Sequence, residues 1–329
     1  MDFFLRRYAL PLRYPIRLKN QYGQQEKLSI REGLYLELKD GDGRAAIAEI
    51  APLPLFSKES LEDSSDQIRF AIPKLQQLAF SGLPELISFF DQVALFPSVR
   101  CGIEALYLSY LKQKLNKKNV SALFEKDMDW KGFFRQEGDV FSTQLITIGD
   151  DLSRIKNTSC IKIKLGRASL EEEVLFLSKV IGALDEKQCL RLDSNRAWSL
   201  EEAIFFFQSV QAKTSILDLT QYIEYMEEPL QDPSQLSTLF DATKIPIALD
   251  ESLLEDYHPD LLNHLGICTL ILKPMLLGGF LAIHQNYLSK GSTQCVVSCL
   301  FESSVGLDYL REWASILFPN AYHGLVRID

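Results

Sequence analysis

Five short apolar runs in the middle of the chain each end in a charged side chain. They are CIKIKLG (160–166), LRLDSN (190–195), YMEEPL (225–230), IALDES (247–252) and LILKPM (270–275). The runs recur roughly every 20 to 35 residues, which is the repeat of a strand followed by a helix. In a parallel β/α barrel the carboxyl ends of the strands meet on one face. The pattern therefore predicts an α/β barrel with these charged ends gathered at one site.

Three of the runs offer one carboxylate each, from Asp193, Glu227 and Asp250. Carboxylate oxygens are hard ligands of the kind that Mg²⁺ prefers, and Mg²⁺ keeps positions for water and substrate. The strand ends offer no imidazole or thiolate, so the set favours Mg²⁺, with Mn²⁺ as an alternative, over zinc. One such acid alone is typical of a helix cap or an exposed strand tip. The ordered set of three acids between two lysine runs favours a metal site.

The first run carries two lysines, Lys162 and Lys164, separated by one residue. Because side chains alternate across a strand, both lysines are expected on the same side, facing the barrel interior. An inward lysine beside a second cation is expected to have a lowered pKa, since burial and like charge both disfavour the ammonium form. The pattern makes Lys164 a candidate base.

Two further acids compete for the role of metal ligand. Glu228 follows Glu227 directly, and Glu251 follows Asp250. Neighbours on a strand point to opposite faces, so only one acid of each pair is expected to reach the metal. Asn195 either orients the site and contacts the substrate or closes an Asx turn after the strand.

The order of these lysines and acids resembles the enolase superfamily, and within it the o-succinylbenzoate synthase family of the menaquinone pathway. The resemblance extends over nearly the whole chain. It is carried by REGLYLEL (31–38), AEIAPLPLFSKESLED (48–63), LRLDSNRAW (190–198), EEPL (227–230), IALDESL (247–253), LKPMLLGG (272–279) and FESSVGL (301–307). It implies an enolase-like, modified (β/α) TIM barrel with an N-terminal α+β capping domain.

The resemblance also implies roles for the charged residues. Lys164 would remove the proton alpha to the substrate carboxylate and help to protonate the departing hydroxide, in a syn elimination of water. Lys162 would hold the carboxylate, and Lys273 would either stabilise the enediolate as a cation or act as a second acid/base. The family pattern places the metal ligand two residues before the proline, which selects Glu227 over Glu228, with Glu251 behind the ligands.

The resemblance places substrate contacts late in the chain. Ser298, Cys299, Glu302, Ser303 and Ser304 lie near the expected end of the seventh strand, where polar groups would receive the succinyl carboxylate. A capped helix start is the alternative interpretation. Gly324 matches a family position near the eighth strand end, whereas the following Val326-Arg327 departs from the family pattern.

Three functions fit this pattern to different degrees. The first is the lyase that makes 2-succinylbenzoate from its hydroxycyclohexadiene carboxylate precursor. The second is a racemase of N-succinylamino acids or an epimerase of dipeptides, which shares all five polar positions. FESSVGL (301–307) favours the lyase. A barrel that only binds a partner is disfavoured, because both lysine runs and all three acids are retained.

Composition narrows the partners and the compartment. The net charge of −9 argues against nucleic acid as the main partner and leaves a small carboxylate substrate. No glycine-rich phosphate loop supports a nucleotide cofactor. The six cysteines form no CxxC pair and fit small buried hydrophobes, and the N-terminus lacks a secretory signal, so the cytoplasm is expected. The sequence leaves the oligomeric state open.

The apolar segment 265–283 is about long enough to cross a membrane. Lys273-Pro274 and Gly278-Gly279 predict instead a short strand, a loop and a helix start, with no membrane contact.

Residue patterns also suggest the domain bounds. Residues 1–110 read as the capping domain, completed by residues 305–329, and residues 111–304 as the barrel, whose first strand is expected in 143–149. Strands are predicted at 34–38 and 45–50, and helices at 61–78 and 100–115. The segment 19–27 is predicted to be a loop that closes over the barrel mouth.

Overall fold

The computed structural model describes residues 1–19, 24–124, 137–156, 158–254, 264, 266–288 and 293–327. It divides into two compact units. Unit 1 consists of Met1–Phe141, Leu272–Gly291 and Val297–Asp329, and unit 2 of Ser142–Ile271 and Ser292–Val296. The C-terminal residues thus group with the N-terminal ones. The domain bounds predicted from the sequence remain a prediction.

Unit 1 contains a three-stranded antiparallel sheet in the order β1-β2-β3. The strands are β1 (Asp2–Lys19), β2 (Gln25–Lys39) and β3 (Ala45–Ile50). Leu34, Leu36 and Leu38 of β2 are buried on one face, as period-two alternation requires. The strands predicted at 34–38 and 45–50 are therefore confirmed.

Part of the predicted loop at 19–27 belongs to strands, because Lys19 ends β1 and residues 25–27 belong to β2. Its residues 20–23 lie outside the described part of the chain, and its closure over the barrel mouth stays a prediction.

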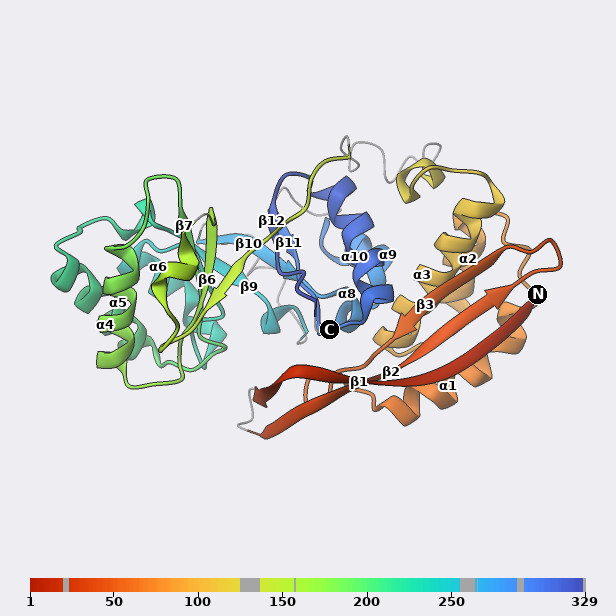
Figure 1. Ribbon diagram of the computed structural model, residues 1–329, viewed down its shortest axis with the longest axis horizontal. Helices are drawn as coiled ribbons and strands as arrows, with labels where there is room; N and C mark the ends of the chain where they lie inside the picture. The colour runs from red at the N-terminus through yellow and green to blue at the C-terminus, as the bar shows by residue number, and fades with distance from the viewer. Residues whose placement is uncertain are drawn as a thin grey trace. The chain divides into compact units, whose positions relative to one another are not determined.

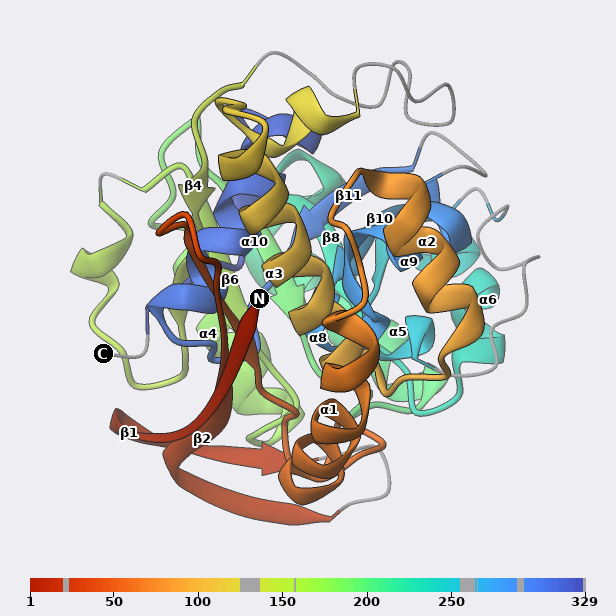
Figure 2. The same ribbon diagram turned by 90° about the vertical axis from the view of Figure 1, so that its right-hand side faces the viewer.

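Six helices of unit 1 lie among the described residues. Ser60 starts the first of them with a capping box to Asp63, which satisfies exposed backbone donors at the helix start. The central helix α3 contacts β3, α8 and α9 (Figure 2), and Trp313 of α10 stacks on Phe280 of α9 with ring centres 4.7 Å apart. The helices are α1 (Leu61–Leu75), α2 (Leu83–Gln92), α3 (Pro97–Lys114), α8 (Pro274–Leu277), α9 (Gly279–Asn286) and α10 (Ser304–Leu317).

The long apolar segment 265–283 is broken as its sequence predicts. Its described residues form all of β10 (Ile267–Leu272), the short helix α8 in place of the expected loop, and the start of α9. Gly278 and Gly279 allow the break, since their φ values of +86° and +89° are unfavourable for other residues. In the part of the chain that the structure describes, no helix is long and apolar enough to cross a membrane.

Most of the parallel sheet belongs to unit 2. Its strand order is β11-β10-β9-β8-β7-β6-β5, and each neighbouring pair from β5 to β10 is parallel. Helices α4, α5 and α6 connect successive strands, and Figure 1 shows α4 and α5 on the outer side of β6 and β7. The alternation of strand and helix is the barrel pattern predicted from the sequence. The strands are β5 (Gln144–Ile146), β6 (Cys160–Lys164), β7 (Cys189–Asp193), β8 (Ile223–Glu227), β9 (Ile247–Leu249), β10 (Ile267–Leu272) and β11 (Gln294–Val297); the helices are α4 (Leu170–Ile181), α5 (Leu200–Thr214) and α6 (Leu236–Thr243).

A third sheet, with two strands, lies near the C-terminal end of the described residues. β12 (Tyr322–His323) pairs with β4 (Phe141–Ser142). Ser298, which follows β11, forms an isolated parallel bridge with Gly324. The predicted seventh strand end is thus the end of β11, and the predicted eighth strand is short.

Candidate functional site

The two lysines of β6 lie on the same side of the strand, as predicted. Both ammonium groups contact Oδ2 of Asp193 on β7, Lys162 at 2.7 Å and Lys164 at 2.5 Å. The parallel register explains this, because Lys164 is the direct partner of Asp193. Two cations therefore meet one fully buried carboxylate.

The next strand adds a second acid to this cluster. Glu227 on β8 is the register partner of Asp193, and its Oε2 lies 2.6 Å from the Lys162 nitrogen. Lys162 therefore bridges the two predicted metal ligands. Lys162, Lys164, Asp193 and Glu227, hereafter the lysine–acid cluster, come together at the carboxyl ends of three neighbouring strands.

The charges of this cluster shift its pKa values. Burial alone would raise the pKa of Asp193, but Lys162 and Lys164 lower it well below the ordinary range. Burial would likewise lower the pKa of Lys162, but Asp193 and Glu227 raise it well above its usual value. The sequence predicted a lowered pKa for an inward lysine beside a second cation. That expectation is reversed at Lys162, because two buried carboxylates outweigh the neighbouring ammonium.

The acid next to Glu227 points elsewhere. Glu228 is buried and accepts hydrogen bonds from Nε of Arg196 at 2.8 Å, the backbone nitrogen of Asp250 at 2.8 Å and that of Ser252 at 2.7 Å. Its carboxylate is thus committed to holding the loops after β7 and β9. This arrangement favours Glu227 as the ligand, and the sequence analysis missed the part played by Arg196 and Ser252.

The third predicted ligand, Asp250, directly follows β9 and is 2 % exposed. Its backbone nitrogen is fixed by Glu228, so the loop that carries its side chain is tied to the end of β8. Lys273 directly follows β10, caps α8 and belongs to unit 1. Its role as a cation or as a second acid/base stays a prediction.

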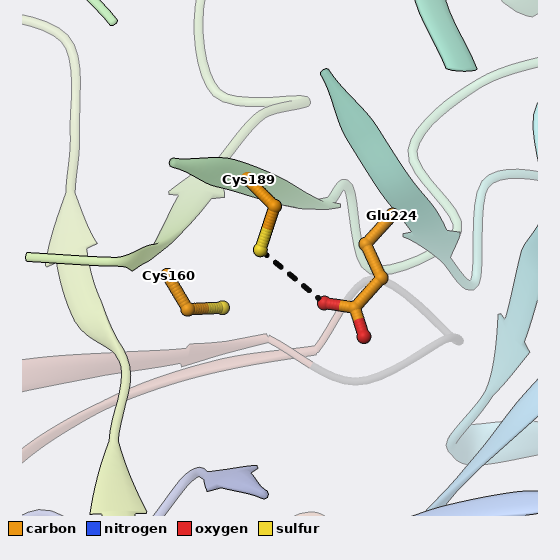
Figure 3. A group of neighbouring side chains, drawn as sticks. All are labelled: Cys160, Cys189 and Glu224. Atoms are coloured by element: carbon orange, nitrogen blue, oxygen red, sulfur yellow. Dashed lines mark hydrogen bonds between the residues drawn. The ribbon is translucent and has the colours of Figure 1, made fainter. Parts of the chain in front are cut away.

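The donor set suits a hard divalent cation, because it consists of carboxylate oxygens. Its three buried acids lie at or just after the ends of three successive strands: Asp193, Glu227 and Asp250. In this structure lysine ammonium groups contact two of the three. Among the described residues, Cys160, Cys189 and Glu224 form a different group, whose possible ligand atoms all lie within 4.8 Å of one another (Figure 3). The predicted Mg²⁺ ligands therefore remain a prediction.

Asn195 contacts Lys164 and both neighbouring acids, Asp193 and Glu251. Its Oδ1 accepts a hydrogen bond from Lys164 at 2.6 Å, and its Nδ2 donates to Oε1 of Glu251 at 3.0 Å. Its backbone nitrogen donates to Oδ1 of Asp193 at 3.1 Å, which forms an Asx turn. The turn and the orienting contact thus occur together, and Glu251 lies behind Asn195.

The predicted substrate contacts after β11 have partners within unit 1. Ser303 is the N-cap of α10, and its hydroxyl donates to Oε2 of Glu49 at 2.7 Å. This favours the alternative of a capped helix start. Ser298 and Gly324 lie close together, since a Cβ at position 324 would meet Oγ of Ser298 at 2.6 Å. Contact of Ser298, Ser303 or Gly324 with substrate stays a prediction.

Comparison with known proteins covers both parts of the chain. Residues 2–107 match the family described as MenC, N-terminal domain, and residues 151–284 match that described as enolase C-terminal domain-like. The chain is 33 % identical to the o-succinylbenzoate synthase of Vibrio cholerae serotype O1, over 98 % of this chain and 87 % of the relative.

Solved structures share the fold. The o-succinylbenzoate synthase from Thermosynechococcus elongatus BP-1, which was solved with magnesium in its active site, matches with a TM-score of 0.67 and 22 % identity over 98 % of this chain and 92 % of that one. The L-Ala-D/L-Glu epimerase from Bacillus subtilis matches with a TM-score of 0.75 and 18 % identity over 100 % of this chain and 89 % of that one. These likenesses establish an enolase-superfamily fold.

Proposed function

Because the chain belongs to the o-succinylbenzoate synthase family of the enolase superfamily, we propose how its own residues carry out that family's reaction. The enzyme is a carbon–oxygen lyase of menaquinone biosynthesis. It removes water from 2-succinyl-6-hydroxy-2,4-cyclohexadiene-1-carboxylate and forms 2-succinylbenzoate. The observation that carries the residue assignment is the lysine–acid cluster, in which two lysines and two acids share hydrogen bonds at the ends of three parallel strands.

The reaction begins with loss of the proton alpha to a carboxylate, for which we assign Lys164 as the base. Its nitrogen is fixed by Asp193 and by Asn195 at distances of 2.5 and 2.6 Å. A group held between two acceptors returns to the same position after each proton transfer, which favours reaction. The lysine that takes the alpha proton then lies on the correct face to protonate the departing hydroxide, as a syn elimination requires.

Lys162 is assigned to the substrate carboxylate. It is 19 % exposed and already binds the carboxylates of Asp193 and Glu227, so it presents a permanent positive charge beside the base. Lys273, which directly follows β10, would stabilise the negative charge of the enediolate.

Asp193, Glu227 and Asp250 would hold Mg²⁺, or Mn²⁺ as an alternative. A bound divalent cation would neutralise the charge that develops on the substrate carboxylate, which lowers the barrier to proton removal by an amine. The three acids lie at or just after the ends of three successive strands, which supports this assignment.

The function is tested by incubating the purified protein with Mg²⁺ and the cyclohexadiene precursor while following the loss of ultraviolet absorbance. A parallel assay measures racemisation of an N-succinylamino acid. Rapid dehydration with slow or no racemisation is expected. Rapid racemisation without dehydration would leave the roles assigned to the lysine–acid cluster intact. It would contradict the assigned substrate and favour the racemase or epimerase alternative.

A further inference from the structure

A second group of ligand atoms lies at the opposite end of the same strands. Cys160 is the first residue of β6, Cys189 the first of β7, and Glu224 the second of β8. Lys164, Asp193 and Glu227 are the last residues of those strands. Cys160 and Lys164 are four positions apart on β6, about 13 Å of strand. The group is therefore separate from the lysine–acid cluster.

Register brings the three side chains together. Cys160 and Cys189 are direct partners in the parallel pairing of β6 and β7, so they project from the same face of the sheet. Sγ of Cys189 lies 3.6 Å from Oε2 of Glu224, and all three ligand atoms lie within 4.8 Å of one another. Figure 3 shows the three side chains directed into one space from three strands.

The carboxylate of this group is oriented by its neighbours. Arg191 donates from Nε to Oε2 of Glu224 at 2.7 Å and from Nη2 to Oε1 at 3.1 Å. Gln294 donates to Oε1 at 3.5 Å. Metal ligands are typically held in position by neighbouring residues that hydrogen-bond to them, as Arg191 and Gln294 do to Glu224.

Two sulfurs and one oxygen suit a thiophilic divalent cation. At a metal–sulfur distance of about 2.3 Å, two thiolates in a tetrahedral site lie about 3.8 Å apart. Neighbouring strands are spaced about 4.8 Å apart, so thiols at paired positions reach this separation by small side-chain rotations. A disulfide would require the same sulfurs to lie about 2 Å apart.

We propose that Cys160, Cys189 and Glu224 bind a thiophilic divalent cation, Zn²⁺ in the simplest case. The cation replaces the two thiol protons, which are released to solvent, and forms two metal–sulfur bonds and one metal–oxygen bond. Because a charge of +2 enters as two protons leave, the charge of the group beside Arg191 is unchanged. Cys189 is half-buried and the side chain of Glu224 is 26 % exposed, so water completes the fourth position. The amino ends of barrel strands serve stability in this fold class, and the bound cation would tie three strands together.

The proposal is tested on the whole protein, kept reduced by a phosphine and held in excess Mg²⁺ so that the carboxylate site is occupied. Cd²⁺ is titrated in, because its thiolate complexes absorb in the ultraviolet and carboxylate complexes do not. One Cd²⁺ per chain is expected to produce the thiolate band, to release two protons and to raise the melting temperature. Zn²⁺ is expected to compete for the same site.

Variants locate the site. Cys160→Ser and Cys189→Ser should each weaken Cd²⁺ binding by about tenfold or more, and Glu224→Gln should weaken binding while leaving both thiols in place. Cys268→Ser is the matched control, a half-buried thiol on β10 outside the group, and should bind Cd²⁺ as the unchanged protein does.

Thermal unfolding of each metal-free variant identifies any that fails to fold, and Glu224→Gln then carries the test. The proposal is overturned if no thiolate band forms, or if the band survives in both Cys160→Ser and Cys189→Ser. It is equally overturned if the reduced protein under air loses two thiols to a disulfide and does not take up Cd²⁺.

Discussion

The nitrogen of Lys164 lies 2.5 Å from Oδ2 of Asp193. The contact joins the assigned base to an assigned metal ligand, and the register of β6 and β7 places the two residues side by side. In the proposed mechanism, this carboxylate serves both the base and the bound cation. Loss of the Asp193 carboxylate should affect both functions.

Replacement of Glu227 should weaken metal binding, whereas replacement of Glu228 should lower the stability of the fold. Glu227→Gln should weaken Mg²⁺ binding about tenfold or more, since an anionic ligand becomes neutral. Glu228→Gln should instead lower the free energy of unfolding by about 3 kcal/mol, because Arg196 is left as a buried cation without its carboxylate. Calorimetric Mg²⁺ titration and thermal unfolding of both variants measure this. If Glu228→Gln abolishes Mg²⁺ binding in folded protein and Glu227→Gln does not, the ligand assignment at the end of β8 is wrong.

Asn195 should act as a positioning residue. Asn195→Ala removes the acceptor 2.6 Å from Lys164 but keeps the backbone donor to Asp193. The expected result is a fall in kcat of about 10 to 100-fold with little change in KM or in Mg²⁺ affinity. Glu251→Gln, which keeps an acceptor for Asn195, is the milder control. A rise in KM at constant kcat would show that Asn195 binds substrate and does not orient the base.

Chelation should stop the reaction reversibly. Exhaustive treatment with EDTA should abolish dehydration, and added Mg²⁺ should restore it, since three buried acids are assigned to the cation. The measurement is the initial rate before chelation, after it and after Mg²⁺ is added back. Full activity in thoroughly chelated protein would contradict the assignment of the three acids.

The stability of the fold should fall as the pH rises from about 4.5 toward neutrality. Burial raises the pKa of Glu104 to about 7, where its carboxylate faces the start of α9 and the hydroxyl of Tyr309. The unfolded carboxyl ionises near pH 4.5, so above that pH the folded state binds more protons than the unfolded state. Stability contributed by the protonated form is therefore lost between about pH 4.5 and pH 7.

Thermal unfolding at pH 5.5 and pH 8 measures this effect. Glu104→Gln, which cannot ionise, should remove about 2 kcal/mol of the difference between the two pH values. Burial also raises the pKa of Glu302, so the part of the pH dependence that Glu302 contributes should remain in Glu104→Gln. An unchanged pH dependence in Glu104→Gln would rule out this role for Glu104.

The strand ends that form the site could be predicted from the sequence, because each lies at the end of an apolar run as long as a strand. The runs from 160, 190, 225, 247 and 270 contain or overlap β6 to β10, and alternation alone placed Lys162 and Lys164 on one side. What the sequence could not supply is the partner of each charge. Glu228 finds Arg196 and Ser252 in loops distant in sequence, and only the folded register brings them together.

The paired cysteines were missed for a similar reason. Cys160 and Cys189 have no CxxC spacing, so the sequence suggested isolated buried thiols. Their pairing follows from the register of β6 and β7. Glu224 joins them where the pairing of β7 with β8 shifts between Leu190 and Arg191. Neither register nor shift can be read from composition or periodicity.

The most direct test of the account compares dehydration by the unchanged protein and by Lys164→Ala at saturating Mg²⁺, with Mg²⁺ binding measured on both. The account predicts rapid aromatisation of the precursor by the unchanged protein and a loss of at least about 10³-fold in the variant, which still binds Mg²⁺. Dehydration at the normal rate by Lys164→Ala would contradict the central claim that this lysine is the base.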